Sequence, residues 1–249
     1  MAACNSSLDG KVVLITGGAR RVGAEIARTM HGAGACVLIH YQSSERAAAE
    51  LAQELNRARS GTAAVQRGDL LSAEAPGNLV NAAVRAFGGL DVLINNASSF
   101  APTRIGEITR AQWNDLIGTN LQAPLFLAQA AVPSLAERRG LILNIVDIHG
   151  LRPLKGYPVY SVAKAGLAML TRSLARELGP EIRVNGIAPG PVLWPEHGMD
   201  EALKREIVGK TALQRHGSPE DVARTALFLA GDAPYITGQI IAVDGGRSI

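Results

Sequence analysis

Residues 12–23 read Val-Val-Leu-Ile-Thr-Gly-Gly-Ala-Arg-Arg-Val-Gly: an apolar run, a glycine-rich turn and the start of a helix-forming segment. The apolar residues occupy successive positions, which is typical of a strand whose two faces are both covered by helices. A glycine-rich turn between such a strand and a helix gathers backbone N–H groups that can bind phosphate oxygens. The stretch therefore predicts the opening strand, turn and helix of a parallel α/β fold.

The same alternation of short β-branched runs with long alanine- and leucine-rich segments continues along the chain, as expected of βαβ units. It predicts an α/β, Rossmann-type, doubly wound parallel sheet of about seven strands, with helices on both faces, in a single domain over residues 1–249. Strands are expected at Val12–Thr16, Ala35–Tyr41, Ala63–Arg67, Val92–Asn95, Leu141–Val146, Arg183–Ile187 and Gln239–Val243. Helices are expected at Arg20–Gly32, Ser44–Arg59, Pro76–Phe87, Ala111–Leu135, Pro158–Leu178 and Ser218–Leu229.

Composition excludes several classes of protein. Of the 249 residues, 47% are hydrophobic and 19% are charged, which supplies a large core and argues against disorder. A formal net charge of +3 makes no basic stripe, so no nucleic-acid partner is expected. No apolar run approaches the roughly 20 residues of a membrane helix, and two cysteines make no disulfide framework. A cytoplasmic protein without a membrane partner or a metal site is expected.

The end of the second strand bears on which dinucleotide the turn would bind. An acid there would bond the adenosine ribose and repel a 2′-phosphate, but residues 40–44 read His-Tyr-Gln-Ser-Ser. With Arg20 and Arg21 nearby they form a neutral-to-positive pocket, which favours NADPH over NADH. In the alternative interpretation the serines only cap the next helix and the arginines are solvated. Asp69, after the third strand, is expected either beside the adenine or as a helix cap.

Tyr160 and Lys164 are spaced i and i+4 on one predicted helix, so their side chains share a face. A cation beside a phenol favours the phenolate, so Lys164 is expected to lower the pKa of Tyr160 toward neutrality. Alone, such a pair is frequent on helix surfaces. Together with the glycine-rich turn and with Asn95-Asn96-Ala97 after the fourth strand, it indicates an acid–base pair.

These motifs, in this order, resemble the short-chain dehydrogenase/reductase family over essentially the whole chain. The resemblance also uses Pro189-Gly190 and the closing residues 235–238 and 243–246. It implies a nicotinamide cofactor, a homotetramer, Tyr160 as proton donor, Lys164 on the nicotinamide ribose and Asn120 in a water relay to the lysine. It implies cofactor contacts from Gly17, Arg20, Arg21, Val22, His40, Tyr41, Ser43, Ser44, Asp69, Leu70, Asn96, Ala97, Ser98, Lys164, Pro189 and Gly190.

Asp147 stands where most members of this family carry a serine whose hydroxyl polarises a carbonyl. A carboxylate accepts hydrogen bonds and repels an oxyanion, so a nitrogen heterocycle suits the site better than a ketone. In the alternative, Asp147 caps a turn and Ser161 or another hydroxyl takes the serine's role.

Three further features resemble the pteridine reductase branch: Arg21 in the glycine-rich turn, His40-Tyr41, and Ser98-Ser99-Phe100. The branch implies a flat pterin between the nicotinamide and Phe100, bonded by Arg21 and Ser98, with Asp147 and Tyr160 supplying the proton. The alternative for Phe100 is a packing role.

A substrate loop is expected at about 189–210. In it Trp194 either lines the site or seats the loop, and His197 is expected to be solvated.

The sequence thus predicts an NADPH-dependent reductase of dihydropterin or oxidised pterin, with dihydrofolate as a further candidate substrate. One alternative is a carbonyl or 3-oxoacyl reductase of the same family. The other is a nicotinamide-binding sensor without catalysis.

Overall fold

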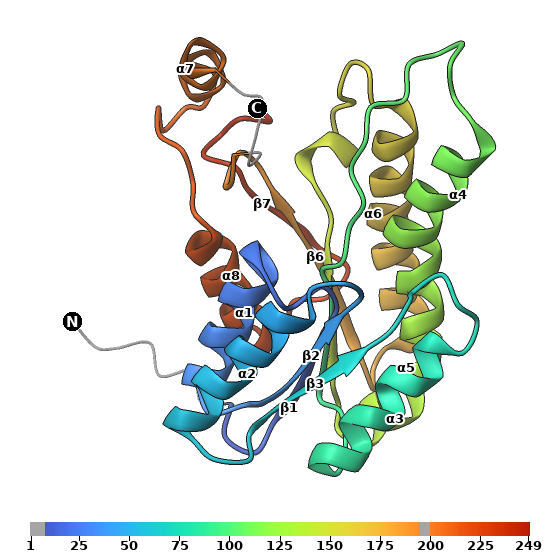
Figure 1. The fold of residues 1–249 in the computed structure, drawn as a ribbon, viewed down its shortest axis with the longest axis vertical. Helices are drawn as coiled ribbons and strands as arrows, with labels where there is room; N and C mark the ends of the chain where they lie inside the picture. The colour runs from blue at the N-terminus through green and yellow to red at the C-terminus, as the bar shows by residue number, and fades with distance from the viewer. Residues whose placement is uncertain (1–7, 195–199) are drawn as a thin grey trace.

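The computed structural model describes residues 8–194 and 200–249, and its centre is a seven-stranded sheet (Figure 1). Every neighbouring pair of strands is parallel, and the order is β3-β2-β1-β4-β5-β6-β7. The chain winds outward from β1 to β3, then returns and winds the other way from β4, so the predicted doubly wound sheet is confirmed. The strands are β1 Val12–Ile15, β2 Cys36–Tyr41, β3 Ala63–Arg67, β4 Val92–Asn95, β5 Leu141–Ile145, β6 Arg183–Pro189 and β7 Ile240–Val243.

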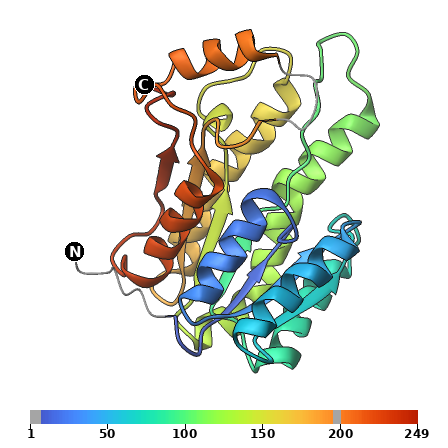
Figure 2. The ribbon, with the colours of Figure 1, turned by 60° about the vertical axis from the view of Figure 1, so that its left-hand side comes forward.

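Helices cover both faces of this sheet (Figures 1 and 2). One face carries α1 (Arg21–Gly32), α2 (Glu45–Ala58) and α8 (Pro219–Gly231). The other carries α3 (Ala75–Phe87), α5 (Ala123–Glu137) and α6 (Pro158–Leu178). None of the helices in the described ranges is long and apolar enough to cross a membrane.

The first strand shows why its sequence is apolar at successive positions. Val13 and Ile15 belong to the core under α1, α2 and α8, whereas Val12 and Leu14 belong to the core that includes α3 and α5. All four are at most 2% exposed. A strand with one wet face would have alternated, so the run of apolar residues reports two covered faces.

The helix expected at 111–135 is interrupted. It consists of α4 (Arg110–Ile117), a π-helical turn at Gly118–Gln122, and α5. Asn120 lies within the π turn and is fully buried. Its side-chain amide forms hydrogen bonds with backbone and side-chain groups near the cleft. One extra residue in a turn leaves no mark on a hydrophobic period, so the sequence pattern could not show it.

A further helix, α7 (Glu201–Gly209), was not expected. Asp200 caps it, because its Oδ1 accepts from the N–H of Leu203 at 2.7 Å. No residue of α7 is buried, and the helix lies apart from the two layers that pack on the sheet (Figure 1). Leu203 and Ile207, four residues apart, give α7 an apolar stripe, but the segment falls within the substrate loop expected at about 189–210.

Candidate active site

A cleft of about 560 Å³ opens at the carboxyl ends of the strands, near the point where the winding reverses between β1 and β4. Parallel sheets bind ligands at such a position. The cleft is lined by every residue expected to contact the cofactor, and by Asp147 and Tyr160. Of the remaining expected site residues, Phe100, Asn120 and Trp194 are not part of the lining. Lining residues that the sequence did not point to include Asp115, Thr119 and Ile145.

The glycine-rich turn is held by the segment that follows β4. Asn96 Nδ2 donates to the carbonyls of Thr16 (2.9 Å) and Gly17 (3.0 Å), and Thr16 Oγ1 accepts from the N–H of Asn96 and of Ala97 at 3.0 Å each. Gly17 has φ +58°, and a Cβ there would lie 3.0 Å from the Cα of Ala97. The turn is therefore fixed from beneath, with its backbone toward the cleft.

Arg21 takes the place of a glycine in this turn and adopts φ 55°, the left-handed region. A non-glycine residue there is strained by about 1–3 kcal/mol, and such strain persists only where the surroundings enforce it. The side chain lines the cleft. A conformation that glycine would adopt freely is thus used to bring a guanidinium to the site.

At the end of β2 the structure contradicts the helix-cap role expected of the serine at the N-cap, whereas Arg20 and Arg21 are exposed, as the alternative interpretation expects of solvated arginines. Ser44 is the N-cap of α2, yet its side chain makes no capping hydrogen bond. No ion pair within 4 Å engages Arg20 or Arg21 in the described part of the chain. Asp69 does not cap α3; its Oδ1 accepts from the N–H of Leu71 (3.1 Å) and from Gln42 Nε2 (3.2 Å).

Tyr160 and Asp147 meet at the other side of the cleft. The phenol of Tyr160 donates to Asp147 Oδ2 at 2.7 Å, and Asp147 Oδ1 accepts from the N–H of His149 at 2.7 Å. Lys164, one turn further along α6, is 2% exposed and donates to the carbonyl of Ile145 at 2.9 Å. Its Nζ lies 5.8 Å from the centroid of the Tyr160 ring.

The electrostatics of Tyr160 differ from the sequence expectation. Burial raises the pKa of Tyr160 above its usual value, and the charge and hydrogen bond of Asp147 raise it further, while a hydrogen bond with Ser98 acts against the rise. Burial also lowers the pKa of Lys164 to about 8, a fall that the charge of Asp147 limits. The expected lowering by Lys164 is therefore wrong for this structure, because burial and Asp147 dominate the pKa of Tyr160 and Lys164 makes no resolved contribution to it. Tyr160 keeps its proton at neutral pH, as a proton donor must.

Asp147 takes both of the roles that the sequence left open, at the site beside Tyr160 and as the cap of a turn. One oxygen caps the 3₁₀ turn at Ile148–Gly150 through His149, and the other faces Tyr160. Ser161 does not replace the missing serine, because its Oγ accepts from the N–H of Leu154 at 3.1 Å and the residue does not line the cleft.

Asn120 ties the loop after β4 to the π turn. Ser98 Oγ donates to Asn120 Oδ1 at 2.6 Å, and Asn120 Nδ2 donates to the carbonyls of Ser99 and Leu116 at 2.9 Å each. Within the described residues no hydrogen bond joins its side chain to Lys164. These bonds position the loop that carries Ser98 and Phe100, and the water relay from Asn120 to Lys164 stays a prediction.

Phe100 lies outside the lining of the cleft, against Tyr160, with 55% of its surface exposed, so it is not a buried packing residue. Its ring stacks on Tyr157 (centroids 4.5 Å apart, planes 11° apart) and meets Tyr160 edge-on at 4.8 Å. Tyr157 lies three residues before Tyr160, a helical spacing that sequence reasoning did not connect to Phe100.

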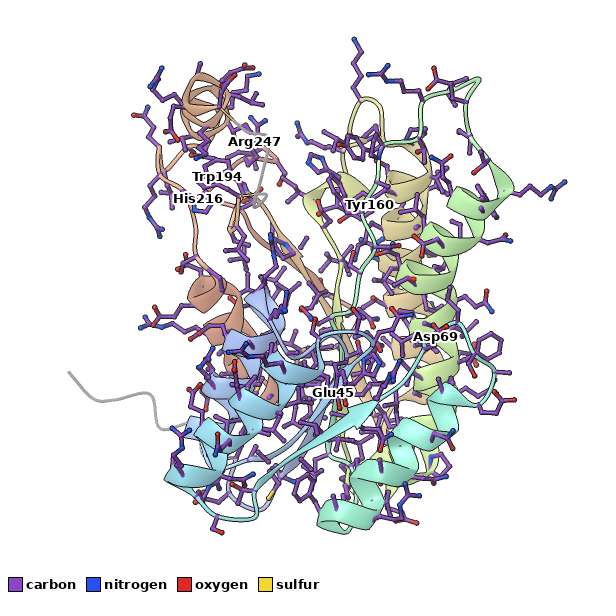
Figure 3. All side chains as sticks on the ribbon, viewed as in Figure 1. Glu45, Asp69, Tyr160, Trp194, His216 and Arg247 are labelled. Carbon is purple, nitrogen blue, oxygen red and sulfur yellow. The ribbon has the colours of Figure 1, made fainter. Side chains whose placement is uncertain are left out.

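The position of Trp194 favours the interpretation in which it packs the substrate loop onto the rest of the protein. Its ring packs on His216 with centroids 4.3 Å apart, away from Tyr160 (Figure 3), while its neighbours Val192 and Leu193 line the cleft. His197, within the expected substrate loop, lies outside the described residues.

Comparison with known proteins identifies the relatives of this chain. The family described as enoyl-(acyl carrier protein) reductase matches residues 17–248. Pteridine reductase 1 of Leishmania tarentolae is 37% identical, over 96% of both chains. The 3-oxoacyl-[acyl-carrier-protein] reductase FabG of Chlamydia muridarum is 35% identical, over 98% of this chain and all of the relative. The 3beta-hydroxysteroid dehydrogenase 1 of Eggerthella lenta is 34% identical, over 97% and 95%.

Among solved structures, a blue fluorescent protein from a metagenomic library, in complex with NADPH, is similar with a TM-score of 0.91 and 34% identity. The match covers 98% of this chain and 100% of that one. The relatives act on different substrates by name, but they share one fold and one family, and the cleft, the Tyr160–Lys164 pair and the glycine-rich turn agree with it. The chain belongs to the short-chain dehydrogenase/reductase family of oxidoreductases.

Proposed function

We propose that this protein is an NADPH-dependent reductase of pterins, which reduces a dihydropterin or an oxidised pterin and also accepts dihydrofolate. One observation carries the proposal: the carboxylate of Asp147 lines the cleft and is bonded to the phenol of Tyr160 at 2.7 Å. In the resemblance to the family, that position holds a hydroxyl in most carbonyl-reducing members. A carboxylate there accepts hydrogen bonds from ring N–H and amino groups and disfavours an oxyanion.

The choice of NADPH rests on charge at the end of β2. Residues 42–44 offer one amide and two hydroxyls without an acid, and Arg20 and Arg21 line the same cleft. These groups suit a 2′-phosphate. The NADPH-bound structure of a protein 34% identical supports the same choice.

The residues of the cleft fit the reduction of a C=N bond. Bound NADPH would supply hydride to the ring carbon, and Tyr160 would give its proton to the adjacent nitrogen. Lys164 would then stabilise the phenolate that remains, while the carboxylate of Asp147 orients the amino and N–H groups of the ring. A proton taken up by Asp147 from solvent would pass along its hydrogen bond to the Tyr160 oxygen and restore the phenol. The exposed Phe100 ring offers a face on which a flat heteroaromatic ring can stack.

The test compares two substrates. NADPH oxidation is followed with dihydrobiopterin and with an acetoacetyl thioester, for the wild type and for Asp147→Ser. We expect turnover of the pterin by the wild type, and a shift toward the thioester in the variant. Turnover of the thioester alone by the wild type would overturn the pterin proposal in favour of a 3-oxoacyl reductase, for which the relative FabG at 35% identity is the precedent.

Tyr160→Phe separates an enzyme from a binding protein. Removing the proton donor is expected to lower kcat by about 10²–10⁴-fold and to leave the Kd for NADPH within a factor of about three. Lys155→Met, a change outside the cleft lining, serves as the control. A sensor without catalysis would show no turnover before the change and none after it.

We also propose that copies of this chain assemble, as a homotetramer, through the exposed face of α5 and α6. Apolar side chains project from both helices: Leu125, Phe126, Val162 and Met169, each 38–61% exposed. Light scattering should give four times the 26.1 kDa of one chain. Phe126→Glu with Met169→Glu should lower that mass, whereas Val84→Glu on α3 should not; a monomeric wild type would contradict the proposal.

A further inference from the structure

His40 joins two loops of the cofactor cleft through one imidazole. It is the penultimate residue of β2, and 2% of it is exposed. The N–H of Gly17 donates to its Nδ1 at 3.1 Å, and its Nε2 lies 3.1 Å from the carbonyl oxygen of Gly68. Gly17 begins the glycine-rich turn, and Gly68 precedes Asp69 on the loop after β3. Both loops line the cleft.

Only one protonation state of the ring satisfies both contacts. The Gly17 N–H is a donor, so Nδ1 must present its lone pair, and the Gly68 carbonyl is an acceptor, so Nε2 must carry the hydrogen. This is the neutral Nε2–H tautomer. A second proton would sit on Nδ1 and point at the N–H of Gly17, which replaces a hydrogen bond with a repulsion.

The backbone around His40 confines the effect of such a proton to one contact. The N–H of Gly18 donates to the carbonyl of His40 at 3.0 Å, and the N–H of Gly68 donates to the carbonyl of Tyr41 at 3.0 Å. Neither bond involves the ring, so both remain when the ring is protonated. The N–H of Gly17 loses its partner, while the carbonyl of Gly17 still accepts from Asn96 Nδ2 and β2 and β3 stay paired.

The charged groups on the elements packed against His40 are few. The glycine-rich turn carries Arg20 and Arg21, β3 and the loop after it carry Arg67 and Asp69, and α3 contributes the apolar Leu79. Burial lowers the pKa of His40 below its usual value, and the Gly68 bond and the charge of Asp69 oppose that fall. The neutral form therefore prevails at neutral pH, and the anchor weakens as the pH falls through the depressed pKa.

We propose that His40 is a positioning residue whose neutral ring orients the N–H of Gly17 and the Asp69 loop in the arrangement that binds NADPH, so that acid loosens the Gly17 end of the turn and weakens cofactor binding. The proposal rests on the proposed function in one respect, that this cleft binds NADPH. It assigns the pH dependence to a residue that takes no part in the proton transfer by Tyr160.

Two variants test the two hydrogen bonds of the His40 ring separately, because each can keep only one of them. Asn at position 40 can keep an acceptor near Nδ1 for Gly17, and Gln can keep a donor near Nε2 for Gly68; neither titrates between pH 5 and 8. The Kd for NADPH is measured by cofactor fluorescence over that range for the wild type, His40→Asn and His40→Gln. The 2′-phosphate of the cofactor itself titrates near a pKa of about 6, so the ratio of each variant to the wild type is the quantity compared.

For the wild type we expect Kd to rise toward acid pH by up to about tenfold per pH unit, the limit for one linked proton. His40→Asn should bind nearly as tightly as the wild type at pH 7.5 and lack this extra rise, and His40→Gln should bind more weakly and also lack it. An acid rise of the same size in all three proteins would overturn the proposal.

A measurement without cofactor keeps the two proposals distinguishable. In wild-type protein labelled with ¹⁵N-histidine, the nitrogen shifts of His40 should report Nε2–H at pH 7.5, and His40→Asn assigns the signal. A hydrogen on Nδ1 overturns the inference whatever the protein binds. The Nε2–H tautomer in a protein that binds NADPH at no pH would instead overturn the proposed function, and with it the role assigned to His40.

Discussion

Asp91 and Asp147 stand at opposite ends of the same sheet, one just before β4 and the other just after β5. Asp91 is 3% exposed and is neutralised by Lys11 at 3.0 Å and Arg138 at 3.1 Å, with a further bond from the N–H of Val12 at 2.9 Å. Asp147 forms no ion pair within 4 Å in the described part of the chain; a phenol and a backbone N–H are its donors. At the amino edge of the sheet, the charge of Asp91 is paired with cations and stabilises the fold. At the carboxyl edge, the charge of Asp147 has no cation partner among the described residues and is available to a ligand.

Of the effects expected from changing these two acids, the largest is on activity. Asp147→Asn should lower kcat for pterin reduction by about 100-fold, because the amide neither accepts as strongly nor returns a proton to Tyr160. Asp91→Asn, measured at a temperature where it is folded, should keep kcat within about threefold. Comparable losses in both variants would show that the contrast between the two edges is mistaken.

Stability should respond in the opposite sense. Asp91→Asn replaces the carboxylate paired with Lys11 and Arg138 by a neutral buried amide and should lower the free energy of unfolding by about 2 kcal/mol. Asp147→Asn removes one turn cap and should lower it by about 1 kcal/mol or less. Urea denaturation of both variants measures the difference, and an Asp147 variant that proves the less stable would reverse the assignment of roles.

The pH dependence of kcat tests the charge of Asp147 through its effect on the pKa of Lys164. With the pKa of Lys164 near 8, the ammonium that stabilises the phenolate is lost above that pH, so kcat should fall on the alkaline side. The negative charge of Asp147 favours the ammonium form, so Asp147→Asn should move this limb to lower pH. Lys164→Arg should abolish it, because a guanidinium stays charged. An unmoved limb in Asp147→Asn would mean that the two groups do not interact.

The smallest effect concerns salt. The cations paired with Asp91 are half-buried, with Lys11 47% and Arg138 33% exposed, so screening should remove only part of their attraction. Raising NaCl from 0.05 to 0.5 M should lower the stability gap between wild type and Asp91→Asn by less than about 1 kcal/mol. A gap that vanishes with salt would make the amino-edge cluster an ordinary surface pair.

The sheet and its covering helices could be predicted because a strand covered on both faces has apolar residues at successive positions, as in Val12–Ile15. The residues that line the cleft could be predicted because they follow the carboxyl ends of strands, which parallel topology gathers at one edge. Both properties are local in sequence and need only the order of the elements.

Other parts of the site depend on contacts between distant segments. The stacking of Phe100 on Tyr157 joins residues far apart in the chain, and no periodic pattern marks it. The pKa of Tyr160 depends on how deeply the phenol is buried and on its distance from Asp147, which spacing on a helix does not supply. The contacts of Asn120 depend on a π turn that hydrophobic periodicity does not record.

The left-handed arginine in the glycine-rich turn has a consequence for laboratory evolution. Glycine at position 21 would relieve a strained backbone, so a selection for heat resistance alone should enrich Arg21→Gly. A selection for turnover should discard the same substitution, because the guanidinium leaves the cleft with it. If both selections are run on one library, the first should therefore enrich glycine at position 21 and the second should retain arginine there.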